Sequence, residues 1–108
     1  MGVTKAELFT PEQNELARIA RVLGHPARIA IVQHLARINA CINGDLVQEL
    51  GLAQATISQH LRELKEAGLI QGTIDGVSVS YCINAARWTE AKKLLNALFD
   101  EVDLRQCC

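Results

Sequence analysis

Apolar residues recur every three or four positions over most of the chain, which is the spacing of helices that bury one face. Residues 10–24 are expected to form a first helix, which Thr10, Pro11 and Gln13 open as a capping box with proline in the first turn. The next helix is expected to begin at Pro26. Because it is apolar on most sides, it should lie at the centre of the fold.

Two polar side chains of this second helix are expected to have structural roles. His34 should be a core or interface histidine rather than a ligand, and Arg28 should form a local salt bridge or cap rather than contact DNA. Residues 39–44 are then expected to form a loop that carries Cys41 immediately before the next helix. A thiolate near a helix N-terminus is stabilised by the helix dipole, although a free cysteine is often just a small buried residue.

Residues 45–69 have the pattern of a short helix, a tight turn and a second helix. The short helix is expected from Asp45, as its N-cap, to Leu50, with the turn at Gly51. The second helix is expected to end at Gly68 and to bury a stripe formed by Ile57, Leu61, Leu64 and Ala67. This arrangement is that of a helix-turn-helix.

The opposite face of the second helix is polar and can donate and accept hydrogen bonds. Such groups can recognise base edges when a recognition helix enters the major groove. A solvated helix in an all-helical domain would also be polar on this side. The candidate DNA contacts on this helix are Gln54, Thr56, Ser58, Gln59, His60 and Arg62.

After Gly68 the hydrophobic period changes from about 3.6 to two, which predicts strands. Residues 69–74 and 77–83 are expected to pair as a hairpin, because Asp-Gly at 75–76 is a strong turn signal. A hairpin beside a helix-turn-helix indicates a winged helix, and Thr73 and Ser78 are its candidate DNA contacts. The tip has no Lys or Arg, so strong phosphate contacts are not expected there.

A final helix is expected after Asn84, its N-cap, with apolar residues at three- and four-residue spacing as far as Val102. So wide a stripe needs a partner, which a second copy of this helix and of the 10–24 helix would provide across a two-fold axis. Residues 1–108 are therefore expected to form one domain of a homodimer, with a short arm (1–9) and a flexible tail (103–108). A dimer would match a palindromic operator.

Composition limits the surroundings and the partners of the chain. The net charge is −1, so any basic surface that binds DNA has to be local or supplied twice by a dimer. Neither a signal peptide nor a membrane-spanning run is evident, which favours a cytoplasmic protein without a membrane partner. Reduced cysteines in that compartment favour metal binding or redox sensing over structural disulfides. Cys82 is expected to be a packed structural thiol, which leaves Cys41, Cys107 and Cys108.

The chain resembles the ArsR/SmtB family of metal-sensing bacterial repressors over about residues 12–102. The matching segments are Leu23–Ile31, Gly44–Leu46, Ala53–Leu64, Ala67–Ile70 and the wing that ends in Tyr81. The resemblance implies a mainly helical winged helix-turn-helix of five helices, with the hairpin between the fourth and fifth. It also implies a homodimer, paired through the first and last helices, that represses an operon until an inducer binds, with no cofactor required.

The resemblance is weaker at the inducer site. Arsenic sensors of this family carry Cys-x-Cys near the helix before the recognition helix, whereas Cys41 here is followed two residues later by Asn43. Zinc sensors use carboxylates and histidine on the last helix, which has no histidine here. Three thiols remain, Cys41, Cys107 and Cys108, and three thiolates suit a soft ion such as trivalent arsenic or antimony.

Two other functions are compatible with the sequence, whereas an enzymatic function is not supported by any motif. A redox or persulfide sensor would need two of these cysteines to bridge, and a winged-helix module that binds protein is compatible with the weak net charge. The sequence has no glycine-rich phosphate loop, no His-Glu-x-x-His and no nucleophile elbow. We therefore expect no enzymatic activity and no small-molecule substrate.

Overall fold

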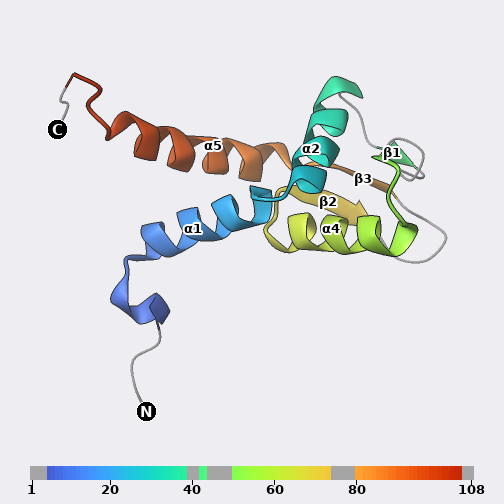
Figure 1. Cartoon of the computed structure of the whole chain (residues 1–108), viewed down its shortest axis with the longest axis horizontal. Coiled ribbons are helices and arrows are strands. Elements are labelled where there is room, and N and C mark those ends of the chain that lie inside the picture. The colour runs from blue at the N-terminus through green and yellow to red at the C-terminus, as the bar shows by residue number, and fades with distance from the viewer. Residues whose placement is uncertain (1–4, 39–41, 44–49, 74–79, 106–108) are drawn as a thin grey trace, which may run out of the picture.

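The computed structural model describes residues 5–38, 42–43, 50–73 and 80–105 (Figure 1). Most of the described chain is helical, and three short strands form a small sheet beside α4. In chain order the elements are η1 (Lys5–Leu8), α1 (Pro11–Leu23), α2 (Pro26–Ile38), β1 (Ile42–Asn43), α4 (Gln54–Glu66), β2 (Ile70–Thr73), β3 (Ser80–Ile83) and α5 (Ala85–Asp100). This mainly helical fold with an antiparallel pair of strands confirms the winged helix-turn-helix architecture expected from the sequence.

Helix α1 begins where the sequence predicts. The Gln13 N–H donates to Oγ1 of Thr10 and the Thr10 N–H donates to Oε1 of Gln13, both at 3.0 Å. These two bonds are the reciprocal pair of a capping box, and Pro11 occupies the first turn. Ile19 and Val22 are its buried residues.

Helix α2 packs against α1, α4 and β3, as expected for a central helix. Ile31, Val32 and Leu35 are buried on this side. Part of its apolar surface is nevertheless open, since Ile29 is 40% and Ile38 is 41% exposed. The surrounding elements cover one face of α2, and the rest is open in the single chain.

Helix α4 buries the stripe that the spacing predicts, with Ile57, Leu61 and Leu64 at most 2% exposed. Gly51, which precedes α4, has a φ of +70°. Leu50 before it is helical, but the rest of the expected helix 45–50 lies outside the described residues. Gly68 has a φ of +83°, and this left-handed conformation ends α4 in a Schellman motif.

Strands β2 and β3 pair antiparallel, with Ile70 opposite Ile83 and Thr73 opposite Ser80. The expected turn at residues 75–76 lies outside the described residues. The sheet has a third strand, because Ile42 pairs with Tyr81 on the other side of β3, which gives the order β1-β3-β2. The expectation that residues 39–44 form only a loop is therefore wrong. A two-residue strand is too short to show an alternating pattern.

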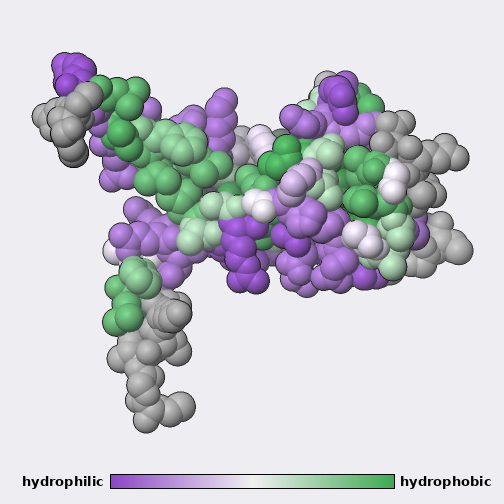
Figure 2. All heavy atoms as spheres, in the orientation of Figure 1, coloured by the Kyte–Doolittle hydropathy of each residue, from purple (hydrophilic) through white to green (hydrophobic). Residues whose placement is uncertain are grey.

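Helix α5 is capped by Asn84, whose Oδ1 accepts the Arg87 N–H at 3.3 Å, as the sequence predicts. Its first half packs near α1, whereas its C-terminal half extends away from the sheet (Figure 1). Apolar side chains remain exposed there, including Leu98 at 41% and Phe99 at 64% (Figure 2). Among the described residues, no helix is both long enough and apolar enough to cross a membrane.

Candidate nucleic-acid interface

The exposed face of α4 carries four of the candidate DNA contacts. The side chains of Gln54, Thr56, Gln59 and Arg62 are exposed, while the apolar stripe on the opposite face is buried in the core. Ser58 is half-buried at the edge of this face. The structure therefore places five polar side chains from the first three turns of one helix at the surface or its edge.

The two glutamines of this face are held along the helix. Nε2 of Gln54 donates to Oγ of Ser58 at 3.3 Å, and Nε2 of Gln59 donates to Oε1 of Glu63 at 3.1 Å. Both pairs have i,i+4 spacing, at which helical side chains are neighbours. A primary amide has a second N–H and a carbonyl oxygen in addition. Each amide can therefore keep its hydrogen bond to Ser58 or Glu63 while its remaining groups contact a base edge or water.

His60 is not on this exposed face. Its side chain is only 8% exposed, and its Nδ1 accepts a hydrogen bond from Nε of Arg28 at 3.1 Å. The sequence-based expectation that His60 lies with the DNA contacts is therefore wrong. Residue 60 follows Ile57 by three positions and precedes Leu61 and Leu64, so the helical period places it at the border of the buried stripe.

Arg28 joins the recognition helix to the junction between α1 and α2. Besides its bond to His60, its Nη1 donates to the Val22 carbonyl near the end of α1 at 3.2 Å. This agrees with the expectation that Arg28 is a local capping group. His25 completes the cluster, since its Nδ1 accepts the Ala27 N–H at 3.1 Å at the start of α2.

The surroundings of His60 favour its neutral form. Burial is the main cause that lowers the pKa of His60, and the nearby His25 and Arg28 lower it further. Glu63 opposes this shift because its carboxylate favours the charged imidazole. A neutral ring is also what the geometry requires, because Nδ1 has to carry a lone pair to accept the Arg28 hydrogen bond.

A polar hollow of about 380 Å³ lies where α1, the start of α2 and the second half of α4 meet. Arg18, Arg21, Arg28 and His25 line it, together with Glu63 and Glu66. The arginine charges are thus partly balanced by carboxylates. This distribution agrees with the low net charge, and it makes the hollow a mixed-charge surface rather than a strongly basic one.

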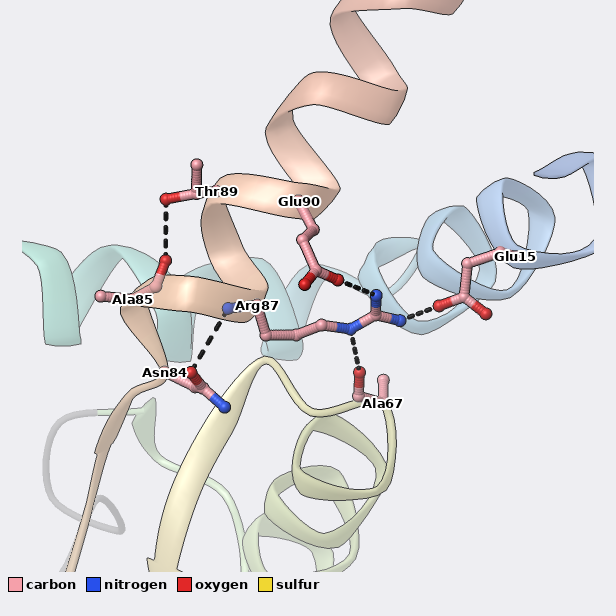
Figure 3. Close-up of polar contacts among 7 residues, drawn as sticks. All are labelled: Glu15, Ala67, Asn84, Ala85, Arg87, Thr89 and Glu90. Atoms are coloured by element: carbon pink, nitrogen blue, oxygen red, sulfur yellow. Dashed lines mark hydrogen bonds and ion pairs between the residues drawn. The ribbon is translucent and has the colours of Figure 1, made fainter.

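Two arginines that sequence reasoning did not single out bind the C-terminal end of α4. Nη2 of Arg18, on α1, donates to the Glu66 carbonyl at 2.7 Å. Nε of Arg87, on α5, donates to the Ala67 carbonyl at 3.0 Å (Figure 3). A helix C-terminus attracts cations, but the sequence gives no sign of which distant arginine would supply them.

Several other candidates cannot be placed. Thr73 belongs to β2, but only its backbone is described, and Ser78 lies outside the described residues. The three candidate thiol ligands, Cys41, Cys107 and Cys108, are also outside them. Within the described ranges, no three His, Cys, Asp or Glu side chains converge as a metal site. Cys82 is half-buried in β3, with its Sγ 3.9 Å from Nε2 of Gln71.

Comparison with known proteins shows the family. Residues 25–71, from the start of α2 through α4 into β2, match the family model described as "Bacterial regulatory protein, arsR family". The chain is 35% identical over 88 residues to the biofilm growth-associated repressor of Xylella fastidiosa, covering 80% of this chain and 72% of that protein. The chain belongs to the ArsR family. The matched segment contains the recognition helix and the Arg28–His60 contact described above.

Two mycobacterial proteins extend this similarity. The ArsR-family chain is 33% identical over 103 residues to the HTH-type transcriptional regulator CmtR of Mycobacterium tuberculosis, which covers 94% of this chain and 86% of CmtR. It is 41% identical over 63 residues to the HTH-type transcriptional repressor SmtB of the same species, covering 58% of this chain and 46% of SmtB. The protein is thus a DNA-binding transcriptional regulator of the ArsR/SmtB type, a family of regulators rather than enzymes.

Proposed function

We propose that this ArsR-family protein represses transcription as a homodimer on a palindromic operator and leaves the DNA when a thiol-reactive inducer binds. The exposed polar face of α4 is the observation that supports operator recognition. In helix-turn-helix proteins the N-terminal residues of the second helix contact base edges in the major groove. Gln54, Thr56, Ser58 and Gln59 occupy that part of α4, and Arg62 follows one turn later.

The amide side chains suit this task chemically. Glutamine can bond to both N6 and N7 of adenine, and hydroxyl groups can bond to any base. Arg62 suits a phosphate or guanine contact because its guanidinium is a planar, permanently charged donor. Thr73 and Ser78 of the wing are the remaining proposed contacts. His60 is left out of the contact set because it is buried and bonded to Arg28.

The exposed apolar surface supports the dimer. Leu8 and Phe9 in the arm are 67% and 55% exposed, and Phe99 and Val102 near the end of α5 are 64% and 60% exposed. Apolar colour covers much of the visible α5 surface (Figure 2). The radius of gyration of 16.5 Å exceeds the value of about 13 Å typical of a compact domain of 100 residues. A second copy packed on α1 and α5 would bury these side chains.

For the inducer we propose arsenite or antimonite held by Cys41, Cys107 and Cys108. The support is chemical, since three thiolates form a donor set that a soft trivalent ion prefers. An inducer releases DNA only if it binds the free dimer more tightly than the DNA-bound dimer. A coupling of about 1–3 kcal/mol is typical of such systems. A persulfide or redox response of the same cysteines is the second candidate, because two thiols can also bridge when oxidised.

The experiment is fluorescence anisotropy of DNA from upstream of the gene, titrated with the full-length protein and then with candidate inducers under reducing conditions. Arsenite, antimonite, cadmium, zinc and copper(I) are added one by one, and polysulfide is added in a separate series. Release by arsenite and antimonite alone supports the proposed inducer. Release by polysulfide alone supports the persulfide sensor. Specific binding that none of them disturbs refutes the thiol site.

Cysteine variants then separate sensing from structure. Cys41→Ser and the double variant Cys107→Ser/Cys108→Ser are expected to bind operator like the wild type and to lose release by arsenite. Cys82→Ser is the matched control, because Cys82 lies in β3 and is not one of the proposed ligands. If the wild-type protein shows no salt-sensitive specific binding even at low salt, operator recognition is refuted and the protein-binding module becomes the better interpretation.

A further inference from the structure

We propose that Arg18 and Arg87 form a clamp that positions the recognition helix for DNA. The clamp is defined as these two guanidinium groups and the carbonyls of Glu66 and Ala67 that they bind. Both arginines come from the helices that the proposed dimer would use, α1 and α5. The inference rests on the proposed function, because it assigns a positioning role in operator recognition by α4.

The last carbonyls of an α-helix have no partner within the helix and need another donor. In α4 the chain itself supplies three of these donors. The Ala67 N–H bonds to the Glu63 carbonyl at 3.2 Å, the Gly68 N–H to the Lys65 carbonyl at 2.8 Å, and the Leu69 N–H to the Leu64 carbonyl at 3.0 Å. The carbonyls of Glu66 and Ala67 then point beyond the helix end.

The clamp binds these two remaining carbonyls. Arg18 reaches that of Glu66 at 2.7 Å and Arg87 reaches that of Ala67 at 3.0 Å. A hydrogen bond from a charged donor is stronger than one from a neutral donor, and positive charge at a helix C-terminus also interacts favourably with the dipole. The C-terminal end of α4 is therefore bonded to both α1 and α5.

Arg87 is itself held in place by several contacts. Its Nη1 donates to Oε2 of Glu90 at 3.1 Å, and its Nη2 forms an ion pair with Glu15 of α1 (Figure 3). The Arg87 side chain is 19% exposed, and its stem lies over Gly68, where an added Cβ would be 3.1 Å from Cγ of Arg87. One side chain thus joins α1, α4 and α5.

The two ends of α4 differ in how they are held. At the N-terminal end the cap residue is Ala53, which has no side-chain capping bond. The clamp therefore adds charged side-chain bonds at the end of α4 opposite to the one proposed to enter the groove, while the buried Ile57 and the Arg28–His60 bond hold the helix between its ends. In a dimer, the clamp would set the angle of each recognition helix relative to the two-fold axis, and with it the spacing of half-sites that both helices can reach together.

The test uses variants of the full-length protein, of which the Arg87 double variant keeps the net charge and the Arg18 variant loses one positive charge, as the control does. Arg87→Met/Glu15→Gln removes the Arg87 bond to Ala67 without leaving Glu15 as an unpaired charge, and Arg18→Met removes the bond to Glu66. Arg18 is exposed, so its variant is expected to fold even if the Arg87 variant does not. Arg105→Met is the matched control, because Arg105 is 91% exposed and its bonds are to Asp103.

Anisotropy is measured against operators whose half-site spacing is changed one base pair at a time, and against unrelated DNA, at several salt concentrations. Each clamp variant is expected to bind the natural operator about tenfold more weakly, since a recognition helix at a changed angle loses well-placed base contacts. Binding to unrelated DNA and the salt slope should stay unchanged, and the preference for one spacing should broaden. Arg87→Lys should restore part of the affinity, because lysine keeps one charged donor.

Three results would overturn the clamp. Unchanged operator affinity in both variants would show that these bonds do not position α4. A salt slope reduced by about 1 for each arginine lost would make the arginines direct phosphate contacts instead. Loss of thermal stability with an unchanged spacing profile would make them purely structural. A wild-type protein that binds no operator would instead refute the proposed function, before any variant is compared.

Discussion

The ring centroids of His25 and His60 lie 4.3 Å apart, with the ring planes tilted by 53°. Each ring accepts a hydrogen bond at Nδ1, His25 from the Ala27 N–H and His60 from Nε of Arg28. Both bonds need an unprotonated Nδ1. The contact between α4 and the start of α2 therefore places the His60 ring, whose pKa is lowered, between the His25 ring and the permanent positive charge of Arg28.

Acid is expected to weaken this fold. The pKa of His60 lies below its ordinary value of 6.5 in the folded chain, so the unfolded chain binds more protons between the two pKa values. The free energy of unfolding should therefore fall as the pH drops from about 6.5 through the lowered pKa. Thermal melts across this range measure the effect.

Two variants identify the residue responsible for this pH dependence. His60→Asn keeps an acceptor for Arg28 and cannot titrate, so it should flatten the profile below pH 6.5. His34→Asn is the control, because His34 lies on α2 outside the His25–His60 contact. A profile that stays steep in His60→Asn would assign the pH dependence to other groups.

The N-terminal end of α4 offers a test that separates stability from binding. Ala53 gives no side-chain cap, so Ala53→Ser and Ala53→Asp should each stabilise the fold by about 1 kcal/mol. If this end approaches DNA phosphates, only the aspartate should weaken operator binding, because its charge repels them. Melting temperatures and anisotropy on the same preparations measure both effects. Equal affinity of the two variants would place this helix end away from the phosphates.

Two glycines are expected to differ in their tolerance of substitution. Gly72 has a φ of +128°, and an added Cβ would overlap the Ser80 backbone and lie 2.8 Å from Cα of Tyr81. Gly72→Ala should therefore cost about 3 kcal/mol or more, from backbone strain and separation of the strands. Gly51 has a φ of +70° with open space around it, so Gly51→Asn should cost less than about 1 kcal/mol. Urea unfolding compares them, and equal losses would contradict the close approach at Gly72.

The apolar end of α5 makes the dimer testable. Phe99→Glu places a charge on a surface that is 64% exposed in the single chain, so a monomer should tolerate it. Burial of that charge in a dimer interface without a partner would be costly. Sedimentation equilibrium should therefore show a shift towards monomer for Phe99→Glu and no shift for Lys92→Glu, which changes an exposed charge on the same helix. A wild-type protein that sediments as a monomer would refute the dimer.

The elements could be predicted from sequence because their signals are local. The Thr10 and Asn84 caps, the stripe at Ile57, Leu61 and Leu64 and the break at Gly68 all depend on residues within a few positions of one another. Period and capping preferences alone therefore locate α1, α4 and α5 closely. The same local reasoning missed β1, because Ile42 pairs with Tyr81, 39 residues further along the chain.

The candidate site was predicted less completely, because it also depends on contacts between residues that are far apart in the sequence. Polarity alone grouped His60 with Gln59, yet the first is buried and the second exposed, because a helix turns about 100° per residue at the border of a stripe. Arg18 and Arg87 were missed because their partners are backbone carbonyls. Every residue has a backbone carbonyl, so the residue types in the sequence do not indicate which carbonyl a distant arginine will bind.

Strand β1 connects the sequence position of Cys41 to the wing. Ile42 follows Cys41 directly and pairs with Tyr81, and Asn43 pairs with Ser80, so the cysteine adjoins a strand bonded to the wing. The pairing of β1 with β3 therefore couples the segment next to Cys41 directly to a strand of the wing. If Cys41 binds the proposed inducer, a shift of this segment would be passed to β3 as well as to the helix-turn-helix that follows it in the chain. Under that proposal, induction would change the wing contacts with the operator without requiring the recognition helix to rotate.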